Sequence, residues 1–102
     1  MGSEKRCKMN RDALVFTGLI VREGDGFYSL CPELAVASQG KTETEAKNML
    51  REAVAGYLES CFESNLPYLR PVPESEDPRR TDAQNVVSVF RLRVDLAVKV
   101  HA

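Results

Sequence analysis

The sequence predicts an α+β domain in which an antiparallel three-stranded meander carries one helix on one face and a long C-terminal strand beside the first strand. Three observations predict this class. Three short runs rich in β-branched and aromatic residues come first, separated by tight turns. A capping box then opens an apolar stripe at helical spacing, and an alternating apolar run closes the chain. With 102 residues the chain has the size of one domain.

The first three strands are predicted from their composition and from the turns between them. Residues 13–21 (ALVFTGLIV) are mostly apolar in both alternating sets, which indicates a central strand covered on both sides. The turn at 23–26 (EGDG) leads to a second strand at 27–31, because Asp-Gly suits the positive φ angles of a hairpin. Residues 32–34 (Pro-Glu-Leu) interrupt it, since proline cannot donate to a ladder, and 35–39 form the third strand.

A helix is predicted over residues 43–63. Thr42 and Glu45 form the capping box at its start, and Asn65 and Pro67 stop it. One apolar stripe recurs at three- and four-residue steps, formed by Ala46, Met49, Leu50, Ala53, Tyr57, Leu58 and Cys61. This stripe is expected to pack on the sheet.

The last part of the chain consists of a Pro-rich connector at 66–84 and a strand at 86–100. The connector is expected to be an extended or mobile segment on the surface. The strand alternates apolar and charged residues, and its length of about 50 Å requires it to bend, bulge or project. A right-handed crossover places it beside the first strand and parallel to it, in sheet order 3-2-1-4. Residues 13–102 are therefore interpreted as a single domain.

Composition and charge exclude several classes of protein. The chain is 43% hydrophobic and 28% charged, unlike a disordered or collagen-like chain, and its net charge of −1 disfavours a protein that coats nucleic acid. No apolar run approaches the roughly 18 residues of a membrane span. The polar N-terminus, residues 1–12, is predicted to be flexible and lacks the apolar stretch of a secretory signal.

The cysteines indicate a reducing compartment. Cys7, Cys31 and Cys61 are three in number and widely spaced, which fits neither a disulfide framework nor a zinc site. We therefore expect a cytoplasmic protein with buried or indifferent thiols.

The segment 24–58 resembles the HicB-like antitoxin family in an ordered set of short motifs. These are Gly26-Phe27-Tyr28, Pro32-Glu33-Leu34, Ser38-Gln39-Gly40, Thr42-x-x-Glu45-Ala46 and Ala53-x-x-x-Tyr57-Leu58. The resemblance implies a partial ribonuclease-H-like fold. It also implies a non-catalytic interaction protein that binds and neutralises a small toxin that cleaves messenger RNA.

Many members of that family carry a C-terminal module that binds operator DNA. In this chain the Pro-rich connector and one long strand stand where such a module would begin. The resemblance therefore implies a stand-alone member, and DNA binding is not expected of it.

Catalytic residue patterns are missing from the sequence. The strand at 13–21 holds none of the carboxylates with which a ribonuclease-H-like nuclease binds divalent metal. Glu23 and Asp25 fall in a turn, and the single histidine, His101, stands next to the C-terminus. No Ser-His-Asp set, P-loop or metal-ligand spacing is present. We expect neither enzyme activity nor a cofactor.

Four residues are candidates for partner binding. Arg91 and Arg93 share a strand face with two valines, which suits either a solvated rim or contact with phosphate or an acidic partner. Pro32 and Glu33 stand at an interruption of the sheet, which is either a structural kink or a contact site. Two further functions stay open: a small-molecule-binding or regulatory module of the same fold, and nucleic-acid binding through Arg91, Arg93 and Lys99.

Self-association is predicted through the last strand. One helix covers only one face of the sheet, and the last strand is a sheet edge with unpaired backbone groups. We expect a homodimer, or a higher homo-oligomer, whose contact involves Val94, Leu96, Val98 and Val100.

Overall fold

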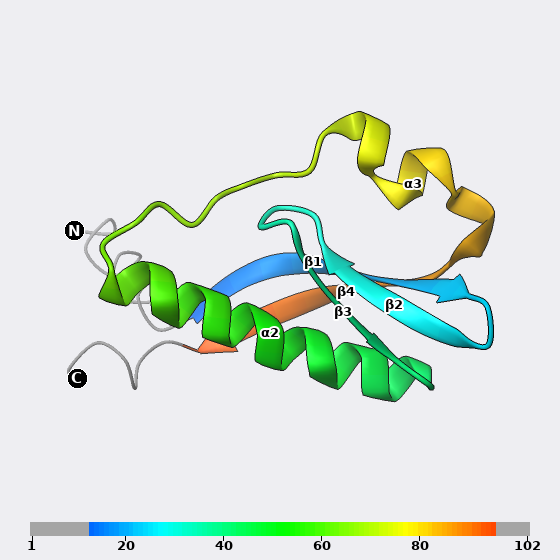
Figure 1. Ribbon diagram of the computed structural model, residues 1–102, viewed down its shortest axis with the longest axis horizontal. Coiled ribbons are helices and arrows are strands. Elements are labelled where there is room, and N and C mark those ends of the chain that lie inside the picture. The colour runs from blue at the N-terminus through cyan, green and yellow to red at the C-terminus, as the bar shows by residue number, and fades with distance from the viewer. Residues whose placement is uncertain (1–12, 96–102) are drawn as a thin grey trace, which may run out of the picture.

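The computed structural model describes residues 13–95, which form a four-stranded sheet, one long helix and a connector with short helical turns (Figure 1). The elements are β1 (Ala13–Glu23), β2 (Gly26–Cys31), β3 (Val36–Gly40), α2 (Glu43–Glu63), η1 (Glu74–Glu76), α3 (Pro78–Thr81), η2 (Ala83–Asn85) and β4 (Val86–Asp95). The strand order is β3-β2-β1-β4, and all neighbours are antiparallel. The predicted α+β class and strand order are confirmed. Residues 1–12, predicted to be flexible, and 96–100, the end of the predicted last strand, lie outside the described residues.

The turns between the first three strands depend on two residues with positive φ. Glu23 pairs with Gly26, and Gly24 adopts a φ of 59°, so that glycine takes the left-handed position of the hairpin. Ala35 has a φ of 55°, which is incompatible with a strand. β3 therefore starts at Val36, one residue later than predicted.

Helix α2 has the predicted bounds because its end signals are local. Thr42 Oγ1 accepts a hydrogen bond from the backbone N of Glu45 at 3.0 Å. The Glu45 carboxylate accepts from the backbone N of Lys41 at 2.6 Å, so the reciprocal bond of this capping box reaches one residue further back than usual. The chain leaves the helix at Asn65, which has a φ of 60°.

The core lies between α2 and one face of the sheet. Leu50, Val54 and Leu58 of the helix pack against strand residues that include Phe16 and Leu92. The predicted apolar stripe is wrong at two positions. Val54, which it omitted, is fully buried, and Met49, which it included, is exposed.

β4 lies beside β1 as predicted, but it runs antiparallel to it, so the predicted parallel direction is wrong. Leu14 pairs with Val94, and Leu19 pairs with Val89. The path of the connector explains the antiparallel direction of β4. After α2 has crossed the sheet, residues 66–85 carry the chain back along its length (Figure 1), and β4 starts near the end where β1 finishes.

The connector and β4 are both less regular than a simple extended chain. Residues 66–73 are extended as predicted, but the short helical turns η1, α3 and η2 follow them. Asp77 caps α3 by accepting from the backbone N of Arg79 at 2.9 Å. In β4 the pairing passes from Ser88 to Val86 and skips Val87, so the predicted bend takes the form of a β-bulge.

Candidate functional site: an open face on β1 and β4

The sheet face that points away from α2 carries alternate residues of β1 and β4. Paired residues in an antiparallel sheet share a face, and Phe16 and Leu92 pair on the helix side. The intervening pairs therefore lie on the opposite face. These pairs are Val15 with Arg93, Thr17 with Arg91, and Leu19 with Val89.

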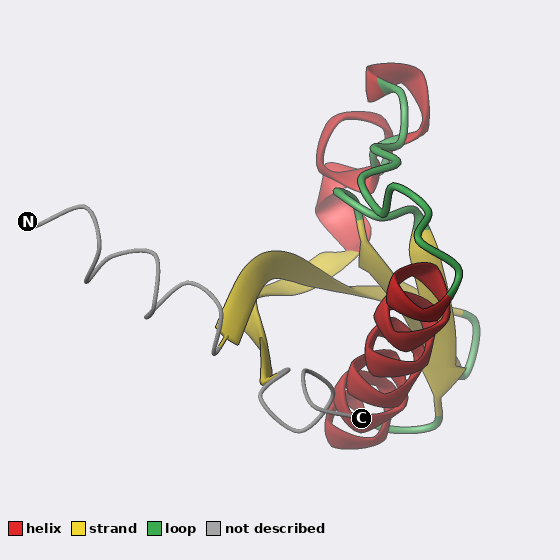
Figure 2. Ribbon diagram, turned by 90° about the vertical axis from the view of Figure 1, so that its left-hand side faces the viewer, coloured by secondary structure: helices red, strands yellow, loops and turns green. Residues whose placement is uncertain are grey.

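The connector covers only part of this face. Leu19, Val21 and Leu30 are buried there, and Pro78 of α3 is buried as well. Figure 2 shows α2 and α3 on opposite sides of the sheet. The predicted two-sided burial of the first strand is thus confirmed for its second half.

The other part of the face stays open. The exposed fraction is 54% for Val15 and 59% for Val89, and both Arg91 and Arg93 are exposed. We call these four residues the β1–β4 patch. Two apolar side chains next to two guanidinium groups suit a protein surface that combines apolar and carboxylate groups, because arginine binds carboxylates in bidentate geometry. The predicted exposure of Arg91 and Arg93 beside valines is confirmed, and their binding role stays a prediction.

The Pro32–Glu33 turn closes the edge of β1 where β2 ends. The Glu33 carboxylate accepts hydrogen bonds from Thr17, one from the backbone N at 3.0 Å and one from Oγ1 at 2.7 Å. The backbone oxygens of Glu33 and Pro32 accept from the backbone N of Arg70 and of Val72, both at 2.9 Å. Pro32 is buried and Glu33 is half-buried. These contacts favour the structural reading of the turn, while a partner-binding role for it stays a prediction.

Cys31 lies at the same corner and is a protected thiol. It is fully buried, and its Sγ stands 3.7 Å from a Glu33 carboxylate oxygen. Burial, together with the nearby negative charge of Glu33, raises the pKa of Cys31 to about 12. Such a group does not act as a thiolate nucleophile near neutral pH.

An ion pair lies within the connector, at the start of α3. Asp77 and Arg79 approach to 2.7 Å between Oδ2 and Nη2. The hydrogen bond that Arg79 donates lowers the pKa of Asp77. The same contact raises the pKa of Arg79, and the negative charges of Asp77 and Glu33 add to this shift, whereas burial opposes it.

A second basic group lies on the helix side of β4. The Lys47 Nζ stands 4.9 Å from the centre of the Phe90 ring, and the Arg51 guanidinium carbon stands 5.9 Å from it. Positive charge therefore flanks β4 on both faces. This arrangement was missed at the sequence level, because it depends on how α2 crosses the sheet.

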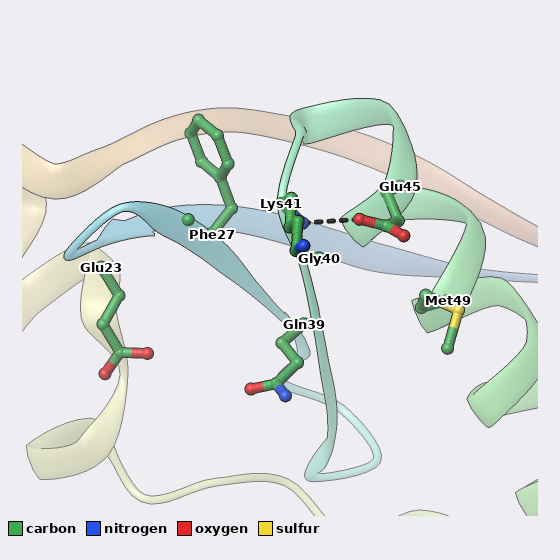
Figure 3. A pocket seen from close by; sticks show the side chains of 8 residues that line it. Glu23, Phe27, Gln39, Gly40, Lys41, Glu45 and Met49 are labelled. Carbon is green, nitrogen blue, oxygen red and sulfur yellow. Dashed lines mark hydrogen bonds between the residues drawn. The ribbon is translucent and has the colours of Figure 1, made fainter.

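Two hollows lie outside the β1–β4 patch. The first has a volume of ≈ 380 Å³ and lies between the β2–β3 pair and the start of α2; Figure 3 shows Lys41 and Glu45, joined by a hydrogen bond, at its wall. The second has a volume of ≈ 470 Å³ and lies at the end of α2. It is lined mainly by apolar residues, among them Phe62, Leu66 and Leu69.

Val94 is the one predicted self-association residue that the structure describes, and it is 6% exposed because it packs in the core of its own chain. Leu96, Val98 and Val100 lie outside the described residues, as do Lys99 and His101.

Within residues 13–95, no group of three His, Cys, Asp or Glu side chains could hold a metal ion. No helix of that part is long and apolar enough to cross a membrane.

The sequence holds a signal for the contact between Thr17 and Glu33 that the predictions above missed. Thr17 is the only side chain in the run 13–21 that can form a hydrogen bond, and Glu33 is a lone acid between Pro32 and Leu34. A polar residue in an apolar strand and an acid in an apolar turn are both expected to have partners. Here each is the partner of the other.

The fold resembles one seen in a toxin-antitoxin assembly. One chain of a solved structure described as "HicA3 and HicB3 toxin-antitoxin complex" matches with a TM-score of 0.55 and 18% sequence identity. The match covers 76% of this chain and 94% of that chain. No protein-family model and no curated protein matches this chain. The likeness shows a shared fold.

Proposed function

We propose that the chain is a cytoplasmic, non-catalytic antitoxin-like protein, a stand-alone HicB-like member that binds and neutralises a small toxin that cleaves messenger RNA. The observation that carries this proposal is the β1–β4 patch, where exposed valines and arginines occupy a part of that sheet face that the connector leaves open. The fold shared with a chain of a toxin-antitoxin complex supports the class of partner.

The patch sets the chemistry expected of the partner. Val15 and Val89 offer apolar area, and Arg91 and Arg93 place two positive charges beside it. The matching toxin surface should therefore carry apolar side chains with one or more carboxylates. Contacts of this kind derive most of their affinity from a few central side chains.

Co-expression with any small ribonuclease that a neighbouring gene encodes tests the proposal. The two proteins should elute as one complex from a sizing column, and the chain should stop cleavage of messenger RNA in a purified assay. Elution as separate species, with RNA cleavage unchanged, contradicts the proposal.

Point variants test whether the patch is the contact surface. Val89→Asp and Arg91→Glu should each weaken the complex by roughly tenfold or more. Leu69→Asp is the matched control, because it places the same acid on an exposed apolar residue outside the patch. Equal weakening by Leu69→Asp and Val89→Asp would place the contact elsewhere.

A second candidate function is a small-molecule-binding or regulatory module of the same fold. The hollow between the β2–β3 pair and α2 favours it, because Gln39, Lys41 and Glu45 place polar groups next to the apolar Phe27 and Met49 (Figure 3). A metabolite screen by thermal melting should then give a shift that Gln39→Ala removes. A screen without shifts, alongside a tight protein complex, rejects this alternative.

A further inference from the structure

The outer edge of β4 is a long strand edge. β4 stands at one end of the sheet, and within residues 13–95 only β1 pairs with it. It has 10 residues, twice the 5 residues of β3 at the other end. An edge of this length offers a row of backbone donors and acceptors, to which another extended segment can add as a further strand.

Basic side chains lie on both faces of this edge. On the face away from α2, Arg91 and Arg93 are exposed, and they share that face because they are two residues apart in a strand. On the helix face, the Lys47 Nζ stands 4.9 Å and the Arg51 guanidinium carbon 5.9 Å from the centre of the Phe90 ring. We call the outer side of β4, together with Lys47, Arg51, Arg91 and Arg93, the β4 edge site.

The four charges of the β4 edge site have no acidic partner among the described residues. The salt bridges of residues 13–95 lie within the connector. The Arg51 side chain donates a hydrogen bond to the neutral side chain of Asn48, at 3.2 Å. A carboxylate that approaches either face of β4 would therefore meet a cation that no carboxylate of residues 13–95 neutralises.

We propose that the β4 edge site binds an acidic extended segment of another protein, which adds to the four-stranded sheet as a fifth strand beside β4. Backbone hydrogen bonds to β4 hold the segment, and its carboxylates select it. The side chains of a strand alternate between its two faces. Acidic residues at successive positions therefore reach the two arginines of β4 on one face and the two basic residues of α2 on the other.

The single sign of the charge selects this occupant. Charges on an edge strand prevent unselective pairing. Because all four charges here are positive, they repel a basic segment and attract an acidic one.

The acidic segment has to come from another molecule. Residues 1–12 contain four basic and two acidic residues, and residues 96–102 contain no acid. The acidic run of the connector, residues 74–77 (ESED), lies in η1 and at the start of α3, so it is not extended.

The proposal goes beyond the β1–β4 patch, with which the β4 edge site shares Arg91 and Arg93. The patch is a side-chain surface on one face of the sheet. The edge site adds the backbone of β4 and two basic residues of α2 on the other face. It does not require a toxin, and Lys47 and Arg51 lie outside the patch, so variants there separate the two proposals.

Fluorescence anisotropy with two synthetic peptides tests strand addition. The probe is a labelled peptide of about six residues, the usual length of a strand, with glutamates at successive central positions and threonines at its ends. The second peptide has the same sequence with methylated backbone nitrogens, so it keeps every carboxylate but cannot donate backbone hydrogen bonds. It should bind at least about tenfold more weakly than the first. Equal binding of the two peptides overturns strand addition.

Charge reversal on each face tests the site. Lys47→Glu and Arg91→Glu should each weaken binding of the first peptide on the order of tenfold, because each replaces an attractive charge by a repulsive one. Lys41→Glu is the matched control. It reverses an exposed lysine that follows β3, at the opposite end of the sheet, and should change binding by less than about twofold. A melting curve verifies that each variant folds. Equal weakening by all three variants overturns the site.

Other occupants of the edge give different outcomes. A single-stranded oligonucleotide that binds more tightly than the peptide overturns the proposal, because the basic groups would then serve phosphates. Peptide affinity that falls as the chain concentration rises, with a dimer seen by light scattering, gives the edge to a second copy and overturns it as well. A chain that binds the toxin but not the peptide overturns strand addition and leaves the proposed function standing. Peptide binding without a toxin complex has the opposite meaning.

Discussion

The carboxylate of Glu33 replaces a missing strand for Thr17. The pairing of β1 with β2 is regular from Leu19 and Leu30 to the hairpin, and its continuation would bring Thr17 opposite Pro32. The chain turns away there, and Glu33 accepts hydrogen bonds from both the backbone N and the hydroxyl of Thr17. A side chain thus satisfies a strand edge that the sheet leaves open.

Removal of that carboxylate should destabilise the protein. Glu33→Ala leaves the backbone N–H and the hydroxyl of Thr17 without their acceptor, and we expect the free energy of unfolding to fall by about 2 kcal/mol. Urea unfolding gives the value. Glu76→Ala, at an exposed acid of the connector, is the control and should change it by less than about 0.5 kcal/mol. Equal effects of the two variants would refute the role of Glu33.

Two glycines should respond in opposite directions to the same substitution. The Phe90 ring lies across Gly18, where a β-carbon would overlap it, whereas no atom stands within 4 Å of a β-carbon at Gly56. Gly18→Ala should cost about 2 kcal/mol or more through overpacking. Gly56→Ala, on the exposed side of α2, should stabilise by about 1 kcal/mol. Thermal melting of both variants would contradict this account if both shifts had the same sign.

Local signals were sufficient to predict the helix and the three-stranded meander. Thr42, Glu45 and Asn65 act within a few residues of themselves, and α2 begins and ends where they indicate. β3 starts one residue later than predicted, because Ala35 has a left-handed φ. An alanine gives no indication of such a φ, whereas a glycine would.

Features set by distant parts of the chain could not be predicted in the same way. The direction of β4 depends on the path of the whole connector, whose length allowed either direction. The open patch depends on which end of β1 the connector covers. Val15 and Val21 are equivalent in the apolar pattern, yet Val21 is buried and Val15 is exposed.

A buried hydroxyl offers a route to higher stability. Ser29 is fully buried, and its Oγ has no hydrogen-bond partner among the described residues. Ser29→Ala should raise the free energy of unfolding by about 1 kcal/mol, because the desolvation of the hydroxyl no longer opposes folding. Ser38 pairs with Ser29 on the same sheet face but is half-buried, so Ser38→Ala should have a smaller effect. A loss of stability in Ser29→Ala would contradict the prediction.

The raised pKa of Cys31 should make the fold sensitive to alkali. The thiol titrates near 9.0 without its surroundings and at about 12 in the folded chain, because burial and then the Glu33 carboxylate disfavour the thiolate. The folded state holds this proton more tightly than the unfolded state does. Its contribution to stability is therefore complete below pH 9 and is lost as the pH rises toward 12.

Urea unfolding between pH 8 and pH 11 under reducing conditions measures this loss. The free energy of unfolding should fall above pH 9 by up to about 1.4 kcal/mol per pH unit more in the unchanged protein than in Cys31→Ala. Burial also raises the pKa of Tyr28 and Tyr57, and their contribution is common to both proteins. Val54→Ala removes core volume without a titrating group, so it should lower stability at every pH and keep the original slope. If Cys31→Ala also keeps that slope, Cys31 is not the group that makes the fold sensitive to alkali.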